Sequence, residues 1–199
     1  HKGLLAVNEE LSPALAALSA LNTRGAESFL QQEIPGRKTE AWKYTSLFNL
    51  TSNEEGYGRL AEKHSAAGLD GISTIPALDA QRLVFVNGQY SKELSSNSDH
   101  KNVVRFSQAN EIQQQIIADN LGTALEQEKH IFGALNNAIS KDGVLVHIEK
   151  NEQLKTNIQI THITTPDVKP FTVASRLLIV LETGANATVV EHFASNDAE

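Results

Sequence analysis

The sequence predicts an α+β protein, in which a helical amino-terminal region with a small hairpin precedes a region of strands. Up to about residue 143, apolar residues recur mainly at intervals of three and four, which is typical of amphipathic helices. From Val144 onward they alternate, or run together in short segments between turn residues, which is typical of strands. We therefore expect one region at 1–143 and a second at 144–199.

Two helices are expected before residue 35. Ser12 and Pro13 suit the N-cap and the first position of a helix. Thr23 suits the cap of a second helix, which must end near Ile34 because a proline and a glycine follow. The apolar residues expected to face the core are Leu11, Leu15, Leu18, Leu21, Phe29 and Leu30. Residues 53–71 are rich in glycine, serine and charge, and predict a loop or weak helix.

A hairpin is predicted at residues 82–91. The apolar run 82–86 precedes Asn87-Gly88, a pair that readily adopts the positive φ angles of a type I′ turn. Val103 to Phe106 is a candidate further strand. Helical spacing then returns, with Ser107 as the expected cap and Lys141-Asp142-Gly143 as the end. The residues that carry this spacing are Ile112, Ile116, Leu121, Leu125, Phe132, Leu135 and Ile139.

Four strands are predicted at 144–149, 157–163, 171–182 and 187–193. The first alternates in the manner of a half-buried strand, whereas the nearly continuous apolar run 176–181 indicates a strand covered on both faces. Four strands without an intervening helix favour the start of a sandwich or of a β-solenoid. Its open edge predicts further sequence or a partner that covers it.

Composition narrows the classes of function. The net charge of −7 argues against broad attraction to nucleic acid or to an anionic membrane. The absence of cysteine excludes disulfides, thiolate nucleophiles and cysteine-ligated metal within these residues. Apolar runs such as Leu177 to Leu181 are far short of the roughly 20 residues of a membrane helix, and we expect a cytoplasmic protein. The sequence begins at His1 and contains no methionine. We therefore expect that it is a fragment, or that methionine residues of the natural chain are missing from it.

Chemical motifs are sparse. Phosphate-binding, nucleophile-elbow and zinc-protease patterns do not occur, and Gly56-Tyr57-Gly58-Arg59 lacks a phosphate-binding frame. The strand histidines His147, His162 and His192 would form a metal site only if they converged, and separate structural roles are favoured. Glu191 and His192 are adjacent in a strand, so they face opposite sides. Serines 95, 96 and 98 lie in a polar loop without a recognisable base. We therefore assign no catalytic, cofactor-binding or metal residue.

The single tryptophan lies in an unusual run, Arg37 to Leu47, where Trp42 and Tyr44 flank Lys43. One interpretation is an aromatic anchor that fastens a loop to the core, with lysine stems along the rings. The other is a partner-docking surface, since tryptophan, tyrosine and arginine are enriched at interface hot spots. We favour the anchor.

Three segments together resemble the SufD family. The run IPGRKTEAWKYTSL at 34–47 resembles its proline–glycine turn and R-K-x-E-x-W-K-Y-T-x-L motif. The segments RLVFVNGQY at 82–90 and GANATVVEHF at 184–193 are similar to its hairpin and to a later strand, in the same order. The resemblance implies a helical region followed by the first strands of a right-handed parallel β-helix.

The same resemblance implies a function. The expected role is that of a non-catalytic scaffold subunit for iron–sulfur cluster assembly in the SUF system, with SufB and SufC as partners. It implies that the complete complex handles the cluster, and no cofactor is expected on this chain. No family site residue falls on these positions, and homodimerisation of the isolated chain is left open. The alternatives are a metal-dependent hydrolase that uses the strand histidines and a β-rich binding module.

Overall fold

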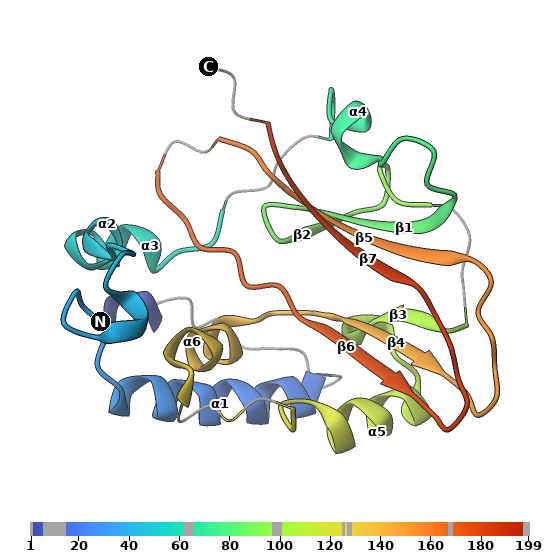
Figure 1. Cartoon of the computed structure of the whole chain (residues 1–199), viewed down its shortest axis with the longest axis horizontal. Helices are drawn as coiled ribbons and strands as arrows, with labels where there is room; N and C mark the ends of the chain where they lie inside the picture. The colour runs from blue at the N-terminus through green and yellow to red at the C-terminus, as the bar shows by residue number, and fades with distance from the viewer. Residues whose placement is uncertain are drawn as a thin grey trace. The chain divides into compact units, whose positions relative to one another are not determined.

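The computed structural model describes residues 2–5, 15–61, 66–96, 101–124, 126, 129–166 and 169–196. These residues form helices and two sheets, which confirms the mixed α+β class (Figure 1). Contacts group them into two compact units, each assembled from separate segments of the chain. Unit 1 comprises 1–60, 105–144 and 169–178, and unit 2 comprises 61–104, 145–168 and 179–199. The division predicted at residue 143 stays a prediction, because the units reflect proximity in space rather than order along the chain.

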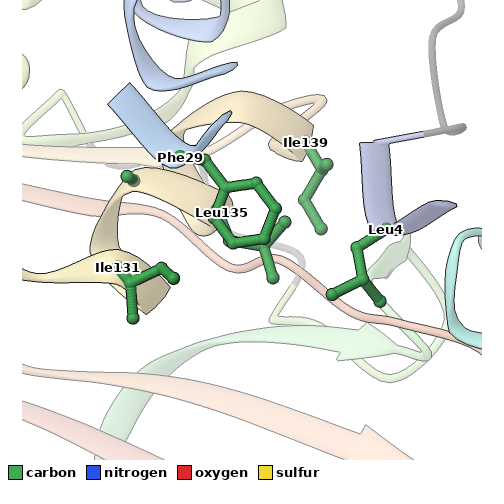
Figure 2. Close-up of a cluster of buried hydrophobic side chains, with 6 residues drawn as sticks. Leu4, Phe29, Ile131, Leu135 and Ile139 are labelled. Carbon is green, nitrogen blue, oxygen red and sulfur yellow. The ribbon is translucent and has the colours of Figure 1, made fainter. Parts of the chain in front are cut away.

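Unit 1 is organised around the helix α1, Ala16–Gln31, which packs against α6, Ile131–Ile139. Phe29 of α1 lies among Ile131, Leu135 and Ile139 of α6, and Leu4 closes the cluster (Figure 2). These side chains are almost completely buried. Burying a large apolar side chain stabilises a fold by about 1.5–3 kcal/mol, so this cluster is a major source of the unit's stability.

The sequence prediction for the first helices was partly wrong. Thr23 caps no second helix, because it lies inside α1, where its hydroxyl donates to the Ser19 carbonyl. Leu18, Leu21 and Phe29 are buried along one continuous helix, whereas Leu30 is exposed. The predicted cap residues 12 and 13 lie outside the described residues.

The helix α5, Glu111–Asn120, begins at Asn110 and not at the predicted Ser107. Asn110 and Gln113 form a capping box, since each side chain accepts a hydrogen bond from the other residue's backbone N–H at 3.0 Å. Ser107 instead donates to the Asp142 carboxylate at 2.6 Å. Ile112, expected in the apolar stripe, is 74% exposed; Ile117 faces the core. Leu125 lies outside the described residues.

Short elements complete the helical regions. They are the 3-10 helices η1, Lys2–Leu5, η3, Glu40–Trp42, and η4, Phe106–Gln108, and the helices α2, Phe48–Ser52, α3, Glu54–Tyr57, and α4, Asp70–Ser73. The predicted loop or weak helix at 53–71 contains α3 and the start of α4. No helix among the described residues is both long and apolar enough to cross a membrane.

The larger sheet has the order β2-β1-β5-β7 and belongs to unit 2 (Figure 1). Its strands are β1, Ala80–Val86, β2, Gln89–Ser91, β5, Asn157–Thr164, and β7, Val189–Ser195. The predicted hairpin is confirmed, since β1 and β2 pair antiparallel around Asn87 and Gly88, whose φ angles are 48° and 82°. β1, β5 and β7 pair in parallel, with Phe85 opposite His162 and His162 opposite Phe193.

The smaller sheet has the order β3-β4-β6. Its strands are β3, Val103–Arg105, β4, Val144–Ile148, and β6, Leu177–Leu181. The burial prediction was wrong for both long strands. The central β4 buries neighbouring residues on both faces, whereas Ile179 and Leu181 of the edge strand β6 are 45% and 48% exposed. Residues 171–176, predicted as strand, are not part of β6.

Within unit 2, one stretch of chain lies alongside a later stretch. The Glu182 N–H donates to Ile148 O at 3.0 Å, and Gln153 and Asn186 form a parallel bridge. The pairing of β5 with β7 continues this alignment. Residues 148–164 and 182–195 therefore follow the same course, one beside the other.

Candidate functional site

The three strand histidines have different partners and do not converge. His147 of β4 has its Nε2 atom 2.9 Å from a carboxylate oxygen of Glu182. Glu182 also accepts the Lys150 backbone N–H at 3.0 Å. The hydrogen bond to His147, followed by that from Lys150, holds the pKa of the Glu182 carboxyl below its usual value. This pair connects the end of β4 to the residue that follows β6.

His162 lies in a row of rings on one face of the larger sheet. Its ring stacks on Phe85 at a centroid distance of 5.7 Å and on Phe193 at 4.8 Å, with interplanar angles of 24° and 22°. Tyr90 extends the row, since its centroid lies 5.8 Å from that of Phe85. Burial lowers the pKa of the imidazole, although the carboxylate of Glu191, 3.1 Å from Nε2, opposes the shift. The row therefore favours a neutral, stacked imidazole.

His192 lies on the opposite face from this row. The register places it beside Thr161, and its Nδ1 atom is buried without a hydrogen-bond partner among the described residues. Glu191 pairs across the strands with His162, as the alternation of strand residues allows. No group of three metal-ligating side chains occurs in the part of the chain that is described. The geometry thus gives the hydrolase hypothesis no assembled histidine site.

The loop serines satisfy backbone groups of the hairpin. The Ser95 hydroxyl accepts the Val84 N–H at 3.0 Å and donates to Ser91 O at 2.6 Å. The Ser96 hydroxyl accepts the Arg82 N–H at 2.9 Å. Ser98 lies outside the described residues. Both described serines therefore extend the hydrogen bonding of the β1 edge.

The two-glycine segment 56–59 also has a packing role. A Cβ atom on Gly58 would overlap the Gly3 carbonyl oxygen, so the close approach of these two backbones requires a glycine. Arg59 donates from Nε to Pro170 O and from Nη2 to Lys169 O, both at 2.9 Å. Hydrogen bonds to the main chain thus occupy its guanidinium.

A polar cluster around β4 was missed by the sequence interpretation. Lys101 lies 3.2 Å from Glu152 and 3.7 Å from Glu149, and the Asn102 amide donates to Glu152 at 2.9 Å. Hydrogen bonding to Glu152 is the largest cause of a raised Lys101 pKa, and the bond from Asn102 is the largest cause of a lowered Glu152 pKa. No spacing in the sequence indicates it, because residues about 50 positions apart form the cluster.

The two aromatic rings of the run 37–47 differ in their surroundings: one packs on a helix and the other is exposed. Trp42 packs on Phe132 of α6, with the centroids 5.2 Å apart and the planes inclined at 54°. The anchor interpretation is therefore confirmed for Trp42. Tyr44, however, is 91% exposed, and the Lys43 ammonium lies 5.3 Å from its ring centroid. Sequence alone did not separate the roles of these two rings.

Comparison with known proteins identifies the class of protein to which this fold belongs. The family described as SufBD protein N-terminal region matches residues 7–160, and the chain therefore belongs to the SufBD family. This match extends from the helical region to residue 160, within β5. It includes both the Trp42 segment and the β1–β2 hairpin.

Two curated relatives agree with the family assignment. An iron–sulfur cluster assembly SufBD family protein of Synechocystis is 29% identical over 164 residues, which cover 80% of this chain and 35% of the relative. The iron–sulfur cluster assembly protein SufD of Escherichia coli is 28% identical over 175 residues, which cover 86% of this chain and 38% of the relative. The chain thus spans little more than a third of the length of either relative.

Proposed function

We propose that this chain is the amino-terminal part of a non-catalytic scaffold subunit for iron–sulfur cluster assembly. The family match over residues 7–160 carries the proposal. Two relatives that match at least 80% of this chain have iron–sulfur cluster assembly in their names. In this proposal the cluster is cargo, which the complete complex handles, and the chain contributes contacts between proteins rather than a reaction.

The strands at 144–199 are proposed to be the first turns of a right-handed parallel β-helix. Two observations support this: β5 and β7 pair in parallel, and residues 148–164 run beside 182–195. The crossover connection that joins two parallel strands of one sheet is right-handed in about 98% of known cases. Such a stack offers its last strand for further pairing, which is a suitable basis for a scaffold.

The proposed partners are SufB and SufC, in the cytoplasm. The test is to express the full-length gene with an affinity tag at its native level, and to purify the protein without denaturant. We expect SufB and SufC to co-purify in near-stoichiometric amounts, and neither to co-purify with the tag alone. Recovery of the folded full-length protein without either partner would overturn the proposal.

A further inference from the structure

Residues 37–48 expose aromatic and basic side chains that the packing of Trp42 on Phe132 does not explain. We define the 37–48 surface as the side chains of Arg37, Lys38, Lys43, Tyr44 and Phe48, all of which are exposed. From them we propose that this surface docks an acidic segment of a partner protein that also carries apolar side chains. The contacts and charges of this surface alone support the inference, which is independent of the function proposed above.

The first observation is that the surface has a fixed support. Trp42 packs on Phe132, which itself contacts the buried cluster of α1 and α6. Three backbone N–H groups close successive turns within the segment: Thr39 to Gly36 O at 2.9 Å, Trp42 to Thr39 O at 2.9 Å, and Thr45 to Trp42 O at 3.0 Å. A surface held in one conformation loses little conformational entropy when it binds.

The second observation is the exposure of two large rings within five residues. Tyr44 is 91% exposed and Phe48 is 72% exposed. Neither ring takes part in the ring packing that fastens Trp42 to α6. Aromatic side chains supply a large contact area with few rotatable bonds, and they concentrate at the centres of interfaces.

The third observation is the local charge. Residues 37–48 contain three basic side chains and one acidic one, Glu40, and so have a net charge of +2 in a chain of net charge −7. No carboxylate of the described residues lies within ion-pair distance of Arg37, Lys38 or Lys43. Unpaired cations beside exposed rings are complementary to carboxylates that accompany apolar side chains.

The charge of the remaining chain favours a protein segment over a nucleic acid as the occupant. Aromatic rings with cations also bind single-stranded nucleic acid. Such binding, however, depends on a basic groove that follows many phosphates. Here three cations lie on a protein whose other residues have a net charge of −9, which would repel a polyanion but would tolerate a short acidic peptide.

The test is photo-crosslinking in cells with the full-length protein. Tyr44 is replaced by p-benzoylphenylalanine, and in a matched control the same residue replaces Ile112, which is 74% exposed on α5. The cells are irradiated, and mass spectrometry identifies the crosslinked peptide. We expect crosslinks from position 44 to a segment of another protein that has a net negative charge and contains apolar residues.

Charge reversal tests the electrostatic part of the proposal. In the position-44 protein, Lys38→Glu together with Lys43→Glu should reduce the crosslink about tenfold, because both attractive charges become repulsive. The melting temperature should stay within about 2 °C of the parent, since both lysines are exposed. Trp42→Ser should lower the melting temperature, which separates loss of the anchor from loss of docking.

Four outcomes would overturn the inference. They are crosslinking at position 44 no stronger than at position 112, crosslinking to nucleic acid, crosslinking to a second copy of this protein, and crosslinking to a segment without net negative charge. Failure of SufB and SufC to co-purify would affect only the proposed function. The crosslinking result therefore distinguishes the two proposals.

Discussion

Replacement of Gly25 by alanine tests the close packing of α1 against α6. A Cβ atom at this position would lie 2.7 Å from the Ala138 nitrogen, 2.7 Å from the Asn137 Cβ and 2.9 Å from the Ala134 oxygen. All three atoms belong to the backbone or to the base of a side chain, so rotation of a side chain cannot relieve the overlap. The two helices must separate locally.

Two opposing terms set the size of the effect. Alanine is favoured over glycine in a helix interior by about 1 kcal/mol. Overpacking costs about 1–3 kcal/mol, and the rigid surroundings place this site at the upper end of that range. The expected net result is a loss of about 2 kcal/mol, which corresponds to a fall of about 4–8 °C in melting temperature for a chain of this size.

Urea unfolding followed by circular dichroism measures this free energy. Gly71→Ala is the matched control, because Gly71 lies in the helix α4 and a Cβ atom there would meet nothing within 4 Å. The control should be neutral or gain up to about 1 kcal/mol. If Gly25→Ala were as stable as the parent, α1 and α6 would not pack as closely as described.

Three further substitutions test other contacts. Asn110→Ala should destabilise the protein by about 1 kcal/mol through loss of the α5 cap, as measured by urea unfolding. Asn87→Ala should destabilise the protein by about 3 kcal/mol in the same assay, for two reasons. It removes the oxygen that accepts the buried Thr165 N–H at 2.8 Å, and it places alanine at a φ of 48°, which alanine disfavours. Burial lowers the pKa of His162 in the folded state, so the unfolded chain binds more protons and stability should fall as pH drops below about 6.5. His162→Gln should flatten this dependence in thermal melts at pH 7 and pH 5.

Local rules predicted the hairpin and most of the strands. Asn87 and Gly88 determine their turn through their own φ preferences, so a two-residue signal is enough. Helix boundaries were less accurate because several residues can act as caps. Asn110 forms the capping box of α5, while Ser107 bonds to Asp142, which is close only in the folded chain. Thr23 is compatible with the interior of α1 because its hydroxyl bonds within the helix.

The candidate surface was only half predictable. The sequence singled out residues 37–47 by their aromatic and basic side chains, and it offered an anchor and a docking surface as alternatives. The structure assigns the anchor to Trp42 because Phe132, 90 positions later, lies against it. Tyr44, two residues beyond, has no such neighbour among the described residues and is exposed. Spacing along the chain carries no information about which ring meets a partner from another helix.

The sequence by itself determined that the last four strands follow the last helix, where the hairpin turns, and which residues are apolar. Only the tertiary structure decided which apolar residues are covered. Residues 144–148 alternate in the pattern predicted for a half-buried strand, but they form the central strand β4, which is buried on both faces. Residues 177–181 are entirely apolar, yet they form the edge strand β6, where two of their side chains are about half exposed. The spacing of apolar residues describes a single strand, whereas the burial of that strand depends on the neighbours that the rest of the chain places beside it.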